Sequence, residues 1–167
     1  MVRNLIYTAV FAAGVLVGGI FPGYIAQYEQ RLDAQFDQVT VDLHPFREIA
    51  ARYHGGSMAA LIEYHMASED RTFHDEGLAI RKMVANETRL ETARAAFEAS
   101  LFEQAAYLYF DGDMELSKTT WDAYTPVFVT TRDALLFAAS VGLLFFSAFY
   151  LSVSIIRTVG RRLTKRA

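Results

Sequence analysis

Two long apolar stretches flank a middle segment in which apolar positions recur with a helical period. Residues 4–28 and residues 134–156 contain no Asp, Glu, Lys, Arg or His over 25 and 23 positions. At a rise of about 1.5 Å per residue, these stretches form helices of about 37 Å and about 35 Å. The hydrocarbon layer of a membrane is about 30 Å thick, so both stretches are predicted to be transmembrane helices.

Each stretch also has a second interpretation. The first has features of a cleaved signal peptide, because Arg3 precedes an apolar core over 5–16 and the small residues Gly18 and Gly19 follow it. Against cleavage, the apolar run continues through Ile25 and no A-x-A site is present. The second stretch could be the buried helix of a soluble protein, but the rest of the chain is too small to bury it.

The segment after the first span is patterned as a long amphipathic helix. Apolar residues recur there at spacings of three and four, which places them on one stripe. Pro45 is expected to kink or restart this helix, and Gly55-Gly56 to end it. The stripe comprises Ile25, Tyr28, Leu32, Phe36, Val39, Leu43 and Phe46, and is continued by Ile49 and Tyr53.

The remainder of the middle segment is predicted to form shorter helices. Ser57 is a candidate N-cap for a short helix, and the capping-box-like sequence 72–75 begins a helical period of about 28 residues. A further turn or two reaches Phe110, the sequence 111–113 marks a turn, and another short helix ends before Pro126. Thr130 and Asp133 are spaced as the N-cap and N3 residues of the second span. No strand is expected.

The predicted fold is therefore all-α. Two transmembrane helices flank a periplasmic helical bundle of three to five helices, and the first span continues into a long extramembrane helix. The expected divisions are residues 1–28 for the N-terminus and first span, 29–133 for the periplasmic domain, 134–156 for the second span and 157–167 for a basic tail.

The charge distribution predicts the orientation. Residues 1–28 carry a net charge of +1, residues 29–133 carry −9 and contain all 19 acidic residues, and residues 134–167 carry +5. By the positive-inside rule both termini are expected in the cytoplasm of a bacterium, with the middle segment in the periplasm of the inner membrane. The tail is either only a stop-transfer signal or also a contact for anionic lipid headgroups, through Arg157, Arg161, Arg162, Lys165 and Arg166.

Small residues recur at helical spacing in both spans. Such stripes allow helix backbones to approach closely in lipid, either between the two spans or against a partner subunit. Gly and Ala are also simply common in membrane helices. The predicted packing residues are Gly14 with Gly18, Gly19 with Gly23, and the series Ala134, Ala138 and Gly142.

The sequence offers little catalytic or metal-binding chemistry. There is no cysteine, and the spans contain no ionisable group of the kind that pumps, channels and coupled transporters normally need. The histidines His44, His54, His65 and His74 are spaced by 10, 11 and 9 residues, which matches no metal-binding pattern. We expect no cofactor; His54, His65 and His74 are weak metal candidates, and the simpler role of His54-Gly55-Gly56 is helix termination. The acidic middle segment disfavours nucleic acid.

Aromatic residues are dense before the second span, at Tyr107, Tyr109, Phe110, Trp121 and Tyr124. Core packing is the simpler interpretation. The alternative is a docking surface for a partner or for lipid.

Several short motifs, in this order and spacing, give the chain a resemblance to DUF2937, a family of uncharacterised bacterial inner-membrane proteins. The resemblance implies two membrane spans but no activity, cofactor or catalytic residue. The motifs are Phe21-Pro22-Gly23, Gln27-Tyr28, Arg31-Leu32, His54-Gly55-Gly56, Leu61-Ile62, His65, Ser68, Asp70, Phe73, Glu76-Gly77, Ile80, Thr120-Trp121, Tyr124 and Pro126.

We therefore expect a non-enzymatic inner-membrane protein that binds a membrane-protein partner, or a second copy of itself, as an accessory, assembly or scaffolding subunit. A periplasmic ligand or stress sensor is the alternative, although the 11 residues after Ile156 leave no room for an output domain. A membrane-anchored metal-binding protein is a third hypothesis.

Overall fold

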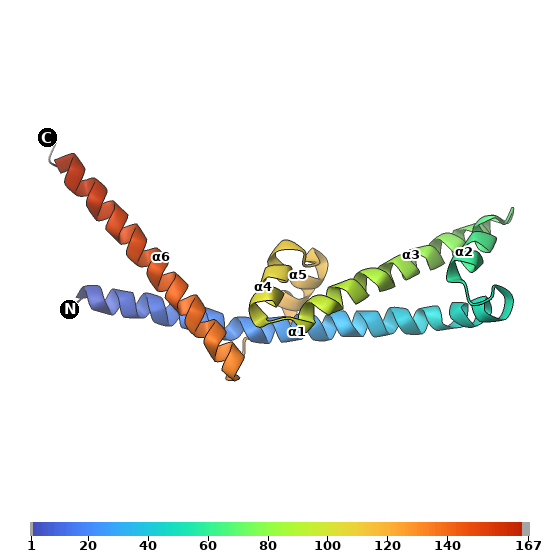
Figure 1. The fold of residues 1–167 in the computed structure, drawn as a ribbon, viewed down its shortest axis with the longest axis horizontal. Coiled ribbons are helices and arrows are strands. Elements are labelled where there is room, and N and C mark those ends of the chain that lie inside the picture. Colours follow the sequence, from blue (N-terminus) through green and yellow to red (C-terminus); the bar gives the residue numbers. More distant parts are fainter. Residues whose placement is uncertain (1, 165–167) are drawn as a thin grey trace. The chain divides into compact units, whose positions relative to one another are not determined.

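The computed structural model describes residues 2–164, with side chains over 4–157, and this part of the chain is all-helical (Figure 1). The all-α prediction is confirmed, as is the continuation of the first apolar stretch into a long helix. The helices are α1 (Val2–Tyr53), α2 (Met58–Met66), α3 (Arg71–Ala95), a 3₁₀ turn η1 (Ala96–Glu98), α4 (Leu101–Phe110), α5 (Met114–Ala123) and α6 (Arg132–Thr164).

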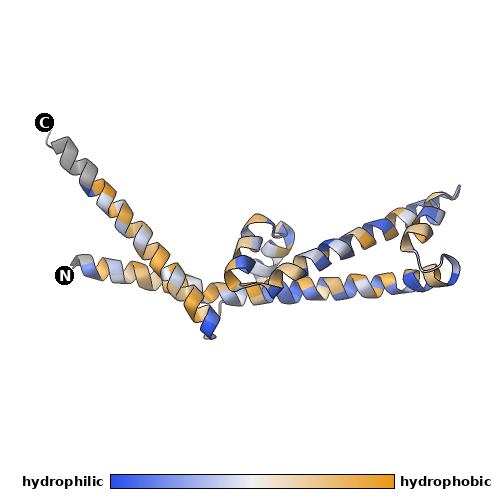
Figure 2. Ribbon diagram, viewed as in Figure 1, coloured by the Kyte–Doolittle hydropathy of each residue, from blue (hydrophilic) through white to orange (hydrophobic). Residues whose placement is uncertain are grey.

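Two of these helices, α1 and α6, are long and apolar enough to cross a membrane, over Asn4–Tyr53 and Arg132–Arg157. Only 22% of the most apolar 18-residue stretch of each helix is buried, so most of that apolar surface faces outward. Figure 2 shows apolar residues along α6 and the first half of α1, whereas polar and apolar residues alternate on the rest of α1 and on α3.

The described chain divides into two compact units. Unit 1 holds residues 2–27 and 100–164, and therefore both apolar helices together with α4 and α5. Unit 2 holds residues 28–99, which form the second half of α1, α2, α3 and η1. These units are defined by contacts within the chain and do not correspond to the predicted periplasmic domain, residues 29–133. That domain stays a prediction.

Helix α1 is uninterrupted over 52 residues, so the predicted restart at Pro45 is wrong. A proline at position 45 leaves the carbonyl of Val41 without its helical partner. Both residues are exposed, so water can hydrate that carbonyl. The predicted apolar stripe is buried or half-buried from Ile25 to Ile49, but Tyr53 is exposed and Ala50 is fully buried in the stripe instead.

In unit 1, α1 and α6 pack through small residues at one level and through aromatic rings at another. A Cβ added to Gly14 would lie 2.8 Å from Cα of Gly142, and one added to Gly18 would lie 2.9 Å from Cα of Ala138. Nearer the termini, the ring of Tyr7 lies 5.7 Å from those of Phe146 and Phe149. Because the contacting side chains become larger toward the termini, the two helices diverge in that direction (Figure 1).

In unit 2, α2 and α3 fold back on the second half of α1. The helix α1 ends where Gly55 and Gly56 adopt φ values of +59° and +84°, which confirms the predicted stop. The apolar interior contains fully buried side chains from all three helices. They include Leu32, Leu43, Leu61, Ile80 and Leu90. Gly77 does not interrupt α3: its missing side chain allows α3 to lie directly against His65 and Met66 of α2.

The helix boundaries correct three expectations. Ser57 caps α2 as predicted, but α3 is capped by Asp70, whose carboxylate accepts from the Thr72 amide at 2.8 Å. Helix α6 begins at Arg132, and Thr131 rather than Thr130 accepts from the Ala134 amide.

The third correction is the end of α3, which stops at Ala95 instead of continuing to Leu101. Ser100 begins a separate helix α4 by a reciprocal capping box: its hydroxyl accepts from the Glu103 amide, and its own amide donates to the Glu103 carboxylate at 3.0 Å. The Ser100 hydroxyl also donates to that carboxylate at 2.7 Å. These hydrogen bonds lower the pKa of the Glu103 carboxyl, with the hydroxyl contributing most.

The α1–α6 contact predicts a strong effect of side-chain size at Gly18. Gly18→Leu places new atoms against Val141 and Ala138, so we expect a loss of about 1–3 kcal/mol or more, the usual cost of overpacking a tight contact. Val17→Leu is the matched control because Val17 is exposed. Thermal unfolding of both full-length variants in mild detergent measures the difference, and equal melting temperatures would contradict the contact.

Candidate interaction sites

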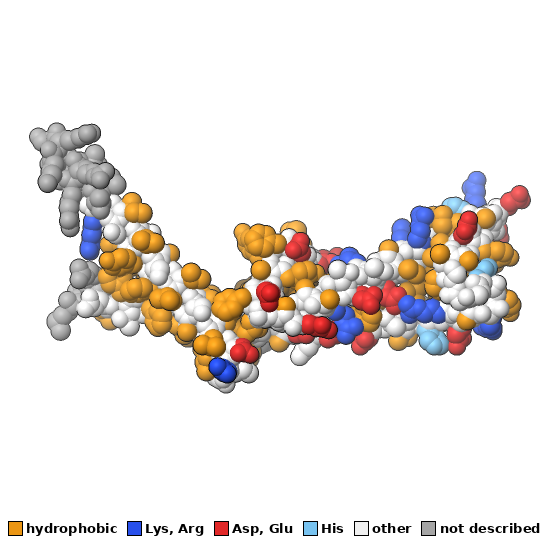
Figure 3. Space-filling view, viewed as in Figure 1, with side chains coloured by type: hydrophobic (Ala, Val, Ile, Leu, Met, Phe, Trp, Pro, Cys, Tyr) orange, Lys and Arg blue, Asp and Glu red, His pale blue; other side chains and the backbone are white. Residues whose placement is uncertain are grey.

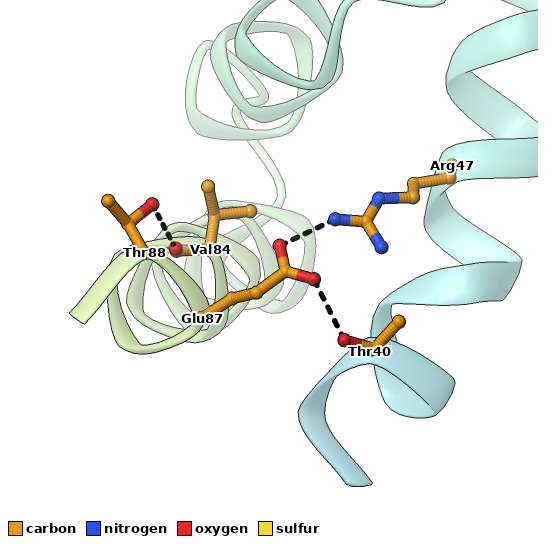
Figure 4. Close-up of polar contacts among 5 residues, drawn as sticks. All are labelled: Thr40, Arg47, Val84, Glu87 and Thr88. Atoms are coloured by element: carbon orange, nitrogen blue, oxygen red, sulfur yellow. Dashed lines mark hydrogen bonds and ion pairs between the residues drawn. The ribbon is translucent and has the colours of Figure 1, made fainter. Parts of the chain in front are cut away.

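Two charged contacts hold α3 along α1 within unit 2. The Glu87 carboxylate accepts from the Thr40 hydroxyl at 3.1 Å and from Arg47 Nη2 at 2.5 Å (Figure 4). Further along the same helices, Arg94 Nε donates to Asp33 at 2.6 Å, and its guanidinium lies 4.4 Å from the centre of the Phe36 ring. These contacts fix the register of α3 on α1 and thereby position the end of unit 2 that carries α2.

That end contains a row of four rings. His54 lies 5.3 Å from Tyr64, Tyr64 lies 6.2 Å from His65, and His65 lies 5.5 Å from Phe73, measured between ring centres. His65 is buried, and its Nδ1 lies 3.4 Å from Oε2 of Glu76. This is within ion-pair distance but outside hydrogen-bond geometry, so among the described residues the buried Nδ1 has no hydrogen-bond partner.

An open cavity of about 410 Å³ lies beside this row. We call it the distal aromatic cavity; it is lined by Tyr64, Ala67, Ser68, Asp70 and Phe73. Both aromatic side chains are exposed, Tyr64 to 66%. The buried His65 ring lies near both of them, with ring centres 6.2 Å from Tyr64 and 5.5 Å from Phe73.

The three histidines that were weak metal candidates have separate neighbours in the structure. His54 contacts Tyr64, His65 lies near Glu76, and His74 Nδ1 lies 3.4 Å from Asp75 on the exposed side of α3. Over residues 4–157, no group of three or more His, Asp or Glu side chains is arranged to hold a metal ion.

An acidic groove lies along α1 and α3 in the same unit. Its lining includes Glu29, Asp33, Glu91 and Glu98, with Arg94 paired to Asp33 among them. Partial burial raises the pKa of the Glu29 carboxyl, and the nearby Asp33 carboxylate raises it further.

In unit 1, the segment between α5 and α6 packs tightly on α1. The Tyr124 hydroxyl donates to the Ile20 carbonyl at 2.7 Å, and the Val129 amide donates to the Gly19 carbonyl at 3.1 Å. A Cβ on Gly19 would overlap the Phe128 ring, and one on Gly23 would lie 2.9 Å from Val127. Gly19 and Gly23 therefore accommodate this connecting segment, whereas Gly14 and Gly18 face α6.

The structure separates the five aromatic residues that the sequence grouped together. Trp121 and Tyr124 both pack on Tyr24, with ring centres 5.6 Å and 5.8 Å away, and Tyr107 is half-buried. Trp121 is nevertheless 63% exposed, and Tyr109 and Phe110 are exposed at the end of α4. Of the basic tail, Arg157 is described and exposed, whereas the side chains of Arg161 and Arg162, and all of Lys165 and Arg166, lie outside the described residues.

The sequence did not predict that Tyr64, Phe73 and Met114 are exposed. Each lies close to a turn, and a large apolar residue next to polar turn residues is a pattern that can indicate exposure. The helical period predicted from 72–75 onward starts with Phe73 as its first apolar residue, but Phe73 is exposed.

A family model described as a protein of unknown function, DUF2937, matches residues 2–162. The chain belongs to this family. No curated protein and no solved structure matches it.

The raised pKa of Glu29 in the acidic groove predicts that replacing this carboxylate stabilises the fold at neutral pH. Because the pKa of Glu29 in the folded chain lies above its usual value of 4.5, the carboxylate costs stability above the folded pKa, and the cost disappears below about pH 4.5. Glu29→Gln should raise the melting temperature at pH 7, with the gain shrinking as the pH falls. Glu63→Gln, on an exposed part of α2, is the control. A gain that grows at low pH would contradict the assignment.

The contact between Tyr124 and α1 is tested by removing one atom. Tyr124→Phe loses the hydrogen bond to the Ile20 carbonyl, which should cost about 0.5–1.5 kcal/mol. Tyr109→Phe removes the same atom from an exposed ring and should have no effect on the melting temperature in detergent. Two indistinguishable unfolding curves would show that the Tyr124 hydroxyl contributes nothing.

Proposed function

We propose that this DUF2937 protein is a non-enzymatic inner-membrane accessory or scaffolding subunit that presents unit 2 to a partner protein. The observation that carries the proposal is the distal aromatic cavity, where Tyr64 and Phe73 are exposed on a frame held by buried contacts. Exposed aromatic residues are typical anchors of protein interfaces, because they bury much area at little conformational cost.

The membrane anchoring is supported by the character of α1 and α6. Both contain a charge-free stretch longer than a bilayer requires, and their exposed surface is apolar. We place both termini in the cytoplasm and unit 2 in the periplasm, because the basic residues follow the second span while the acidic residues lie in the middle segment. The tail residues Arg157, Arg161, Arg162, Lys165 and Arg166 would then lie near anionic headgroups.

The side chains that line the cavity suggest which residue of the partner binds there. Its lining includes two aromatic side chains and Asp70, whose carboxylate also caps α3. A Lys or Arg side chain of a partner fits this combination, since a cation is attracted both by aromatic faces and by a carboxylate. A second copy of the chain is the less favoured partner, because the middle segment carries a net charge of −9 and repels itself.

A ligand sensor is the second candidate, and the same cavity is the observation that favours it. A volume of about 410 Å³ lies within the range of small-molecule sites. The cavity is open, however, and its exposed rings would leave a small ligand largely in water, whereas a protein would cover them.

The decisive experiment is co-purification of the full-length protein from membranes in mild detergent. Tyr64→Ser together with Phe73→Ser should abolish recovery of a stoichiometric partner, while Val41→Ser, an exposed apolar position elsewhere in unit 2, should leave recovery unchanged. Melting temperatures confirm that both variants are folded. A partner retained by the double variant would overturn the role of the cavity. A small-molecule-induced rise in melting temperature that depends on Tyr64 would favour the sensor.

A further inference from the structure

The α4–α5 hairpin of unit 1 ends in large apolar side chains that the structure leaves uncovered. Tyr109, Phe110 and Met114 are exposed to 83%, 76% and 87%, and they flank the turn 111–113. The rings of Tyr109 and Phe110 contact each other edge to face at 4.9 Å. We call these three residues the hairpin tip. Figure 3 shows hydrophobic surface over part of the α4–α5 hairpin.

The hairpin does not use these residues for its own core. Its buried side chains are Gln104, Leu116 and Thr120, which lie on the inner faces of the two helices. Exposed apolar area costs about 25 cal/mol per Å² relative to a covered state. Three neighbouring large side chains held in water are therefore unfavourable, and a covering phase would stabilise them.

The base of the hairpin lies at the edge of the predicted second span. Phe102, in the first turn of α4, packs on Phe137 with ring centres 4.8 Å apart. Phe137 is the fourth residue of the charge-free stretch 134–156, so it lies about 5 Å inside that stretch at the rise of a helix. Leu135 and Leu136 beside it are exposed, as is Phe102. The apolar surface of α6 is thus continuous with the start of α4.

The composition of the hairpin identifies the kind of surface it contacts. Its charged residues are Glu103, Asp111, Asp113, Glu115, Lys118 and Asp122, which give a net charge of −4. Anionic headgroups would repel this charge, so attraction between charges does not bring the hairpin to a membrane. Tyr and Trp next to a span are instead typical of the boundary between hydrocarbon and headgroups, where the ring is buried and the polar tip stays hydrated.

We infer that the hairpin tip inserts into the interfacial layer of the bilayer that α1 and α6 cross, as a third membrane contact of unit 1. The occupant of the exposed apolar surface is lipid, in a neutral leaflet, and not a protein. The inference rests on the membrane anchoring proposed above and is independent of the distal aromatic cavity.

The test uses the full-length protein in phosphatidylcholine vesicles. The natural chain has no cysteine, so single-cysteine variants Phe110→Cys and Met114→Cys can carry an environment-sensitive fluorophore at one position each. Lys118→Cys on the polar side of the same hairpin is the matched control, and Leu143→Cys in α6 reports on the span itself. Fluorescence is quenched either by iodide in the water or by lipids with a nitroxide close to the headgroup.

We expect the labels at 110 and 114 to be blue-shifted, protected from iodide and quenched by the shallow nitroxide, and the label at 118 to respond only to iodide. Labels at 110 and 114 that behave like the label at 118, while the label at 143 is protected, would overturn the inference and leave the membrane anchoring intact. Iodide access at 143 would overturn the anchoring itself. Protection at 110 in native membranes but not in lipid vesicles would assign the tip to a protein.

Discussion

The arrangement of unit 1 depends on the close approach of two helix backbones that carry no charge. In a bilayer no hydrophobic force drives one apolar helix onto another, so association depends on packing and on the absence of side chains between the backbones. Gly14 and Gly18 of α1 lie directly against the backbone of α6 at Gly142 and Ala138. A larger side chain at this level would separate the helices, and the rest of unit 1 is built on their contact.

A second pair of glycines on α1 explains how the segment between α5 and α6 is attached. On α1, Gly19 and Gly23 face the segment between α5 and α6, and that segment donates hydrogen bonds to backbone carbonyls of α1 through Val129 and Tyr124. One helix therefore presents two glycine surfaces, one to a second apolar helix and one to a connecting segment. The α4–α5 hairpin then stands on Phe137 through Phe102, at the border of the apolar region.

The sequence predicted those features that depend on local patterns. The charge-free stretches, the stripe containing Leu32 and Leu43, the Ser57 cap and the glycine stop after α1 all follow from residues close together in the chain. The break before α4 was missed because the helical period continues across it, although Ser100 and Glu103 have the spacing of a capping box. The sequence did not decide whether α1 restarts at Pro45, because the free-energy cost of a proline inside a helix depends on whether the unpaired carbonyl, here that of Val41, is exposed to water.

The candidate sites were harder to predict because they arise from contacts between distant residues. Phe128 covers Gly19, more than a hundred positions away, and no local pattern encodes that pairing. The distal aromatic cavity forms because Gly77 brings α3 against α2, which turns Tyr64 and Phe73 into two walls around His65. A helical period identifies the apolar face of a helix but not where the neighbouring helix ends, so it does not predict that Phe73 is exposed.

The most direct test of the helix contact is disulfide formation in native membranes. A Cβ added to Gly18 lies 2.8 Å from Cβ of Val141, so the variant Gly18→Cys with Val141→Cys brings two thiols together after a small relaxation. The account predicts rapid oxidation to an intramolecular disulfide in this pair and none in the control pair Val17→Cys with Val141→Cys. Equal oxidation of the two pairs, or cross-links only between separate chains, would contradict the packing of α1 on α6.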